Sequence, residues 1–279
     1  MSIIYRYLSS HWYETLRDAE FLASSPNKFN DCLDCAGVAV GEFPRVVVSE
    51  YFTQHDWFGA FSRIAQNSGA SMDVVTEALN SNHFNVDTLN LSRRVSSLLT
   101  NRESLSKVWR IVCFSRPSEN QCENRNTERR MWKRYADKNR GVRIGVDFSY
   151  LTRPKDEYLI HDVFYSDAPA IIDLSESSTT SLSHLDFLRI MFTKIRSIWG
   201  RENEVRLVTS PRFCSVRNSM CFWKFNREIV RQVYLGYRFP TKQLNGLLRM
   251  LSMHYPKELE IYRMLKDDTI AAYQYTRIG

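Results

Sequence analysis

The stretch IIYRYLSSHWYETLRDAEFLAS, residues 3–24, decides the fold. Residues 3–10, IIYRYLSS, are rich in β-branched and aromatic side chains that alternate around Tyr5 and Tyr7, which predicts a β-strand. Residues 10–19 predict a short helix, and residues 20–24 predict a second strand that ends at a turn. A strand, a helix and a strand in close succession are typical of an α+β fold.

The rest of the chain predicts further strands and helices in irregular order. Residues 108–115 form an apolar run typical of a central strand, and residues 127–138 have helical periodicity. Residues 142–148 and 202–209 alternate as strands do. Because no glycine-rich phosphate loop follows the first strand, a doubly wound nucleotide fold is disfavoured. We predict one α+β domain over residues 1–279, with a mixed or antiparallel sheet and flanking helices.

Residues 41–107 differ from their surroundings. Their apolar residues recur at helical spacing, and few of their side chains are suited to chemistry. We predict that this segment is a helical insertion within the domain. It should pack as a cap beside the functional cleft and control the access of an acceptor.

Composition indicates a folded chain with a modest preference for anions. Hydrophobic residues make up 43% and aromatic residues 13%, which favours a packed core over disorder. No apolar run is long enough to cross a bilayer, and the charged residues near the start make a poor secretion signal, so we expect a cytoplasmic protein. The net charge of +7 favours polyanionic partners such as nucleic acid, although many basic proteins bind none.

Cys32 and Cys35 have the C-x-x-C spacing of zinc knuckles and redox motifs. No second closely spaced pair accompanies them, and the segment does not follow the strand-to-helix pattern of a thioredoxin. We therefore expect reduced, partly buried thiols and no metal.

The segment around Glu202, Glu204 and Arg206 is the most informative for chemistry. If it is a strand, these side chains share one face, because residues two apart in a strand point the same way. One interpretation is a charged face exposed to solvent. The other is a functional site, since neighbouring carboxylates raise each other's pKa and such arrangements are often retained for function.

Two further clusters carry polar groups on elements predicted to be buried. Trp132, Tyr135 and Ala136 share a helix face, where core packing is the simplest explanation, but the Tyr135 hydroxyl could reach the rim of a pocket. Arg6 lies between two tyrosines of the first strand. A buried arginine needs a carboxylate or phosphate partner.

Several short motifs run in order over most of the chain: Tyr5-Arg6-Tyr7, the stretch from Leu22 to Asp31, Cys113-Phe114-Ser115, Met131 to Ala136, Gly141 to Phe148, and Trp199 to Arg206. Together they resemble an uncharacterised bacterial family, domain of unknown function 2971. The chain departs from the family pattern at Cys32, where a proline is usual, and at Arg134 and Asn139, where histidines are usual, so no role of those histidines carries over.

The layout also resembles that of ADP-ribosyltransferases, including the DarT type, which modifies DNA. In that fold the first strand carries a basic residue beside an aromatic one, as Arg6 and Tyr7 do here. A middle strand ends in a hydroxyl residue, as at Ser115, and a late strand carries the catalytic glutamate, as at Glu204. The pair formed with Glu202 resembles the two-glutamate motif of arginine-modifying members, in which the second carboxylate is catalytic. The resemblance implies an ADP-ribosyltransferase-like sheet core.

The activity that this resemblance implies is cleavage of NAD and transfer of ADP-ribose to a nucleic acid or protein, as by a bacterial toxin or phage-defence effector. The catalytic residues would be Glu204, which stabilises the oxocarbenium-like state, and Glu202, which orients the acceptor. No metal would be required. The residues expected to contact NAD are Arg6, Tyr7, Asn30, Ser115 and Tyr135.

Two alternatives stay open. Asp31, Glu202 and Glu204 could hold Mg²⁺ in a nucleic-acid-binding or phosphodiester-cleaving protein, and an inert interaction module is a third hypothesis. The transferase hypothesis requires Arg6 and Glu204 to meet in one cleft. A structure with these two residues on opposite sides of the sheet would contradict it.

Overall fold

The computed structural model describes residues 3–9, 11–29, 34–35, 37–40, 102–117, 121–173, 189–195, 199–265 and 273–279. The chain divides into two compact units. The first, called the core unit below, comprises residues 1–24, 111–163 and 200–279, and the second comprises residues 25–110 and 164–199. Residues 41–101 of the expected helical insertion lie outside the described residues, so that expectation stays a prediction; the described end of the segment forms helix α6 (Arg102–Val108).

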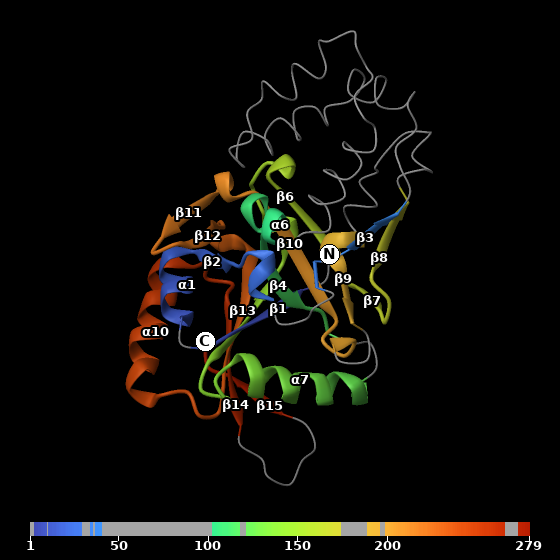
Figure 1. Ribbon diagram of the computed structural model, residues 1–279. Coiled ribbons are helices and arrows are strands. Elements are labelled where there is room, and N and C mark those ends of the chain that lie inside the picture. The colour runs from blue at the N-terminus through green and yellow to red at the C-terminus, as the bar shows by residue number, and fades with distance from the viewer. Residues whose placement is uncertain are drawn as a thin grey trace, which may run out of the picture. The chain divides into compact units, whose positions relative to one another are not determined.

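The core unit is built on an eight-stranded sheet with the order β15-β14-β13-β5-β1-β4-β10-β6 (Figure 1). The pairing of β13 with β14 is parallel. The antiparallel pairs are β1–β4, β1–β5, β5–β13, β6–β10 and β14–β15. The predicted α+β class with a mixed, mainly antiparallel sheet is therefore confirmed. The strands are β1 (Ile4–Leu8), β4 (Arg110–Ser115), β5 (Val142–Val146), β6 (Tyr158–Asp162), β10 (Glu204–Thr209), β13 (Val230–Leu235), β14 (Glu260–Leu265) and β15 (Gln274–Arg277).

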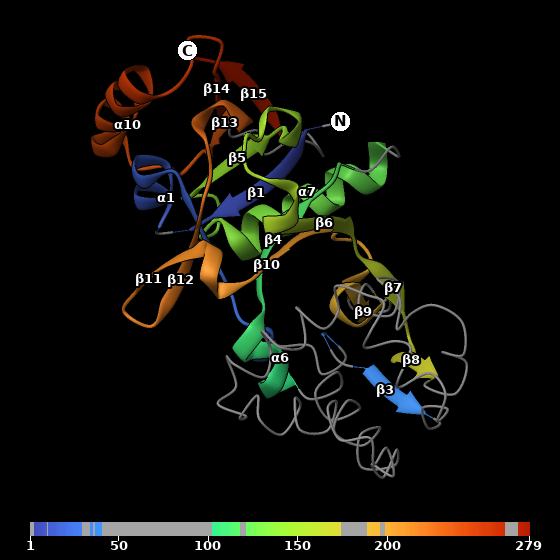
Figure 2. The same ribbon diagram turned by 90° about the horizontal axis from the view of Figure 1, so that it is seen from above.

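One face of this sheet carries the main hydrophobic core and is called the core face. Helices α1 (Trp12–Asp18) and α10 (Thr241–His254) lie side by side and contribute to this core (Figures 1 and 2). A second, three-stranded sheet of β2 (Glu20–Ala23), β12 (Met220–Lys224) and β11 (Cys214–Arg217) adds Phe21 and Trp223 to the same core. Burial of these large apolar side chains stabilises the layered arrangement.

The opposite face of the sheet is called the α7 face, because helix α7 (Gln121–Tyr135) packs on it. Trp132 and Ala136 are completely buried there against tyrosines of β1 and β13. β1 shows how alternation separates the two faces, since Ile4 and Leu8 belong to the core face whereas Tyr5 and Tyr7 belong to the α7 face. The helix begins earlier than the predicted residue 127.

The second unit contains two parallel strand pairs among its described residues. β3 (Gly37–Val40) pairs with β8 (Ala170–Asp173), and β7 (Phe164–Ser166) pairs with β9 (Thr193–Ile195). Short 3₁₀ helices occur in both units: η1 (Pro26–Lys28), η2 (Phe148–Tyr150), η3 (Lys155–Glu157), η4 (Pro211–Phe213) and η5 (Arg227–Ile229). Within the described residues, no helix has the length and apolar character that a membrane crossing requires.

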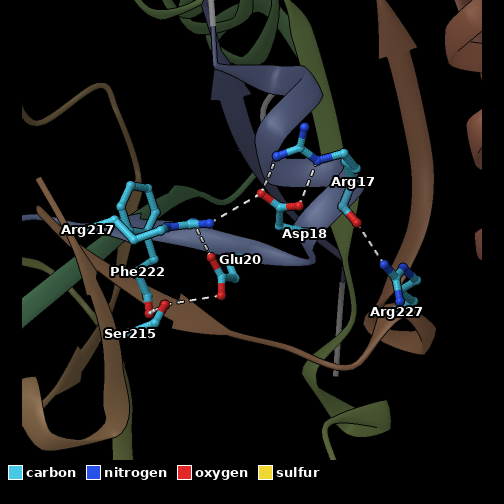
Figure 3. Close-up of polar contacts among 7 residues, drawn as sticks. All are labelled: Arg17, Asp18, Glu20, Ser215, Arg217, Phe222 and Arg227. Carbon is cyan, nitrogen blue, oxygen red and sulfur yellow. Dashed lines mark hydrogen bonds and ion pairs between the residues drawn. The ribbon is translucent and has the colours of Figure 1, made fainter.

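A network of charges joins α1 and β2 to the β11–β12 hairpin (Figure 3). Arg217 pairs with both Asp18 and Glu20, and the Ser215 hydroxyl donates to Glu20 over 3.1 Å. The neighbouring Arg17 guanidinium lowers the pKa of Asp18 by direct hydrogen bonding. Because these carboxylates are already paired with arginines, we interpret the network as a connection that holds the small sheet against α1.

Gly141 occupies a position where a side chain cannot fit. A Cβ atom there would lie 2.0 Å from the Leu8 carbonyl oxygen, which belongs to the central strand β1. We expect Gly141→Ala to lower the free energy of unfolding by about 1–3 kcal/mol, because the backbone must shift to relieve the clash. Urea unfolding measures the effect.

Gly246 on α10 provides a matched control, because a Cβ atom there meets nothing within 4 Å. Gly246→Ala should raise the free energy of unfolding by up to about 1 kcal/mol, since alanine is the better helix former. Equal stability of the Gly141→Ala variant and the parent would contradict the account of Gly141.

Candidate active site

Glu204 and Arg206 lie inside the protein and not on a solvated edge. Their residues are 5% and 0% exposed, and the Arg206 Nε–H donates to Glu204 Oε1 over 2.7 Å. Their strand neighbours Val205 and Leu207 belong to the core face, so the two charged side chains point to the α7 face. The interpretation of this strand as an exposed charged face is therefore wrong.

Glu202 is placed differently from what the alternation predicted. β10 begins only at Glu204, and Asn203 has a left-handed backbone with φ 44°. The chain therefore turns between the two glutamates, and strand alternation does not fix the direction of Glu202. The Glu202 residue is nevertheless only 5% exposed, and Tyr135 at the end of α7 donates its hydroxyl proton to Oε1 over 2.8 Å. The guanidinium of Arg134 lies 3.8 Å from the same carboxylate.

Three hydrogen bonds fix the backbone of the turn that carries Glu202. The Ser115 hydroxyl donates to the Glu202 carbonyl over 2.7 Å, and the next amide, that of Arg116, donates to the Asn203 carbonyl over 2.7 Å. The Thr127 hydroxyl donates to the Arg201 carbonyl over 2.8 Å. Because these donors come from the end of β4 and from α7, both elements hold the position of Glu202. Hydrogen bonds of this kind satisfy carbonyl groups that burial would otherwise leave without a partner.

Arg6 does not join this group, contrary to the expectation from sequence. It is on the core face, since its neighbours Ile4 and Leu8 lie there, and its guanidinium approaches the rings of Phe21 and Phe114. Its Nη atoms donate to the carbonyl oxygens of Cys113 and Leu22 over 2.8 and 3.0 Å. Backbone carbonyls thus take the place of the expected carboxylate or phosphate. Burial lowers the pKa of Arg6 to about 10.

Tyr7 lies on the α7 face but packs into a different cluster, called the aromatic cage below. The cage surrounds the guanidinium of Arg143, whose closest ring centroids are those of Tyr234 at 4.0 Å and Tyr5 at 4.5 Å. Burial raises the pKa of the Tyr7 phenol to about 12. Tyr7 is therefore part of a packed cluster and not an open stacking surface for nicotinamide. The rings of the cage belong to Tyr5, Tyr7, Trp132, Tyr234 and Tyr275.

Direct hydrogen bonds therefore link Ser115, Tyr135 and Glu202, with Glu204 two residues farther along the chain. Arg6 and Glu204 point to opposite faces of the sheet, so the expected convergence of these two residues is wrong. Asn30 and Asp31 lie outside the described residues. Sequence reasoning missed the contribution of Thr127, because we expected this residue to begin the helix and not to point from its middle to a turn.

The part of the chain that the structure describes contains no group of three or more His, Cys, Asp or Glu side chains placed to hold a metal ion. Cys35 is buried within that part, whereas Cys32 is not among the described residues. The expectations for metal binding and for this cysteine pair stay predictions.

Comparison with known proteins gives one match. The family model described as a protein of unknown function, DUF2971, matches residues 131–207. This stretch runs from the last turn of α7 into β10, so it includes Tyr135, Glu202 and Glu204. The match supports the resemblance to this family over that part of the chain. Neither the curated proteins nor the solved structures yield a match.

Proposed function

We propose that the chain is an enzyme that cleaves the nicotinamide–ribose bond of NAD, with Glu204 and Glu202 in its active centre on the α7 face. The observation that carries the proposal is the burial of two carboxylates and the Arg206 guanidinium within one strand and the turn before it. Burying charges is costly unless they are paired, and groups of buried charges are concentrated at functional sites.

The proposed reaction breaks the bond between ribose C1′ and the nicotinamide nitrogen, and nicotinamide leaves as a neutral molecule with the bonding electrons. The ribose then carries positive charge, which the Glu204 carboxylate would stabilise in a site of low water content. Arg206 fixes the orientation of this carboxylate through its hydrogen bond to Oε1. A nucleophile of the acceptor then attacks C1′, and Glu202 would accept its proton.

This proposal differs from the hypothesis based on sequence, which placed Arg6 beside Glu204 and is contradicted in that form. Arg6 cannot hold the diphosphate of a nucleotide on the α7 face, because its guanidinium lies on the core face. The described cation nearest to Glu202 is Arg134, whose side chain is 43% exposed. We assign the diphosphate contact to Arg134, since an arginine can bind phosphate oxygens with two hydrogen bonds.

The experiment is a comparison of nicotinamide release from NAD by the purified protein, with and without bacterial cell extract. We expect release in both cases and faster release with the extract, because the extract supplies the acceptor. NAD labelled in its adenosine part should then mark a macromolecule. Removal of the label by nuclease but not protease identifies a nucleic acid acceptor, and the converse identifies a protein.

The same assay separates the alternatives. Turnover that continues in a chelator excludes the metal-dependent phosphodiesterase, whose Mg²⁺ would be removed. A protein that neither binds NAD nor releases nicotinamide, with or without extract, contradicts the proposal and favours an interaction module.

A further inference from the structure

Helix α7 and the turn after it carry an exposed row of positive charge. Between residues 125 and 140, seven exposed residues are cations and a single exposed residue, Asp137, is an acid. The seven, called the basic row below, are Arg125, Arg129, Arg130, Lys133, Arg134, Lys138 and Arg140.

The position of the basic row follows from the helical period. Arg125, Arg129 and Lys133 repeat every four residues along one ridge, and Arg130 and Arg134 form the neighbouring ridge. Met131 and Trp132 point the other way and are buried, Trp132 against tyrosines of the sheet. The row therefore lies on the solvent-facing side of α7, opposite the buried side. Because packing of the buried side holds the helix in place, the spacing between the cations is constant.

We propose that the basic row binds the phosphate backbone of a nucleic acid. From Arg125 to Arg134 the helix is about 14 Å long, over which one strand of a duplex presents about four phosphates. Five of the seven cations are arginines, which bind phosphate oxygens with paired hydrogen bonds. A nearly uniform line of positive charge matches a polyanion with one charge at each repeat better than it matches a mixed protein surface.

Other anionic partners fit this surface less well. Binding in a membrane interface requires large apolar side chains next to the charges, and none of the described side chains from residue 125 to residue 140 is a large exposed hydrophobic. Protein interfaces depend on buried aromatic or aliphatic anchors, which the exposed side of this stretch lacks as well.

The basic row leads to the candidate active centre. Arg134 belongs to the row and lies 3.8 Å from the Glu202 carboxylate, and the next residue, Tyr135, donates to that carboxylate. A nucleic acid bound along α7 would thus reach Glu202, the carboxylate that we propose accepts the proton of the attacking acceptor. The binding surface stands on its charges alone, and only its use in presenting an acceptor rests on the proposed function.

The test is a fourfold substitution of Arg125, Arg130, Lys133 and Lys138 by glutamine, which retains helix propensity. It leaves Arg134 unchanged because that residue contacts Glu202, and Arg129 because it interacts with Tyr273. A matched control removes the same charge from exposed sites elsewhere in the core unit, by substitution of Lys155, Lys242, Arg249 and Lys257 by glutamine.

Binding to a labelled short duplex DNA, its single strand and the corresponding RNA is measured without NAD over a range of salt concentrations. The magnitude of the slope of log affinity against log salt should fall by about 2.8 to 3.6 in the row variant, because each of the four lost contacts with a phosphate removes about 0.7–0.9. The parent should therefore lose about a hundredfold more affinity than the row variant between about 50 and 200 mM salt. The control variant should behave like the parent.

Unchanged binding in the row variant would overturn the proposal, as would an equal loss in the control. Competition by polyglutamate or anionic vesicles as strong as that by nucleic acid would also overturn it. Binding is measured without NAD, so the two proposals can fail separately. Nucleic acid binding through the row without nicotinamide release would support this inference and contradict the proposed function.

Discussion

Glu204→Gln is expected to lower the rate of nicotinamide release about a hundredfold to a thousandfold, the usual effect of removing one electrostatic contact with a transition state. Glutamine retains the shape and the oxygen that accepts from Arg206, but it removes the charge that stabilises the developing ribose cation. Single-turnover rates at saturating NAD measure this effect on the chemical step directly.

The structure adds a cost that the sequence did not reveal. Arg206 is completely buried, so Glu204→Gln leaves its guanidinium without the carboxylate to which it is paired. Breaking a buried pair from one side costs about 3–5 kcal/mol when no hydrogen bond is retained, and glutamine should lose less. Thermal unfolding of the variant, followed by assays well below its transition, separates loss of stability from loss of rate.

Glu202→Gln is the comparison variant for catalysis. It should slow transfer to the acceptor more than it slows NAD cleavage, because we assign the acceptor to this carboxylate. Its stability should be less affected, since the Arg134 side chain that pairs with it is 43% exposed and water can solvate the guanidinium once the carboxylate is gone. Full nicotinamide release by a folded Glu204→Gln variant would show that β10 is a buried structural element and not a catalytic one.

Glu128→Ala should be the most destabilising single substitution among those considered, by about 3–5 kcal/mol. Glu128 pairs with Arg143 inside the aromatic cage, and it also accepts from the Tyr275 hydroxyl over 2.7 Å. Burial alone would lower the pKa of Arg143, but the electrostatic interactions with Tyr275, Tyr7 and Glu128 raise it well above its usual value. Without Glu128, a charged guanidinium stays buried with rings as its main neighbours. Urea unfolding measures the loss.

Two controls distinguish charge pairing from simple loss of a side chain. Adding Arg143→Met to Glu128→Leu removes both charges, and it should restore much of the stability because an apolar pair can replace a buried ion pair. Asp162→Asn removes a carboxylate that pairs with Arg116 at the surface, where the Asp162 side chain is 61% exposed, and should change stability by less than about 1 kcal/mol. If Glu128→Ala cost no more than Asp162→Asn, the cage would not depend on this charge.

Local sequence patterns predicted those strands whose residues are of strand-forming type and whose ends are marked by a turn or a helix. The predicted strands 3–10 and 20–24 correspond to β1 and β2, because both are short runs of strand-forming residues bounded by a helix or a turn. The predicted strand 202–209 was wrong at its first two residues, because β10 begins at Glu204. There Asn203 takes a left-handed conformation to meet the Arg116 amide, and this is a tertiary contact that no local pattern encodes.

The candidate site was predictable in part for a similar reason. Ser115, Tyr135 and Glu202 lie close together because β4 and β10 are adjacent in the sheet and the end of α7 reaches the turn before β10. Arg6 was misplaced because alternation shows that it opposes Tyr5 and Tyr7, but not which of the two faces is the functional one. The choice depends on α7, which covers the tyrosines and leaves Arg6 with the carbonyl groups of Cys113 and Leu22.

The central place of β1 in the main sheet has a consequence for how the core unit folds. β1 pairs with β4 and β5, and the Tyr5 hydroxyl donates to Gln232 on β13, more than two hundred residues along the chain. Contacts that close such long loops slow folding, because chain entropy is lost before the contacts form. During synthesis, both edges of β1 therefore stay unpaired until β4 and β5, from the middle of the chain, have emerged. We expect slow refolding and a dependence on chaperones at this stage, since unpaired strand edges promote aggregation.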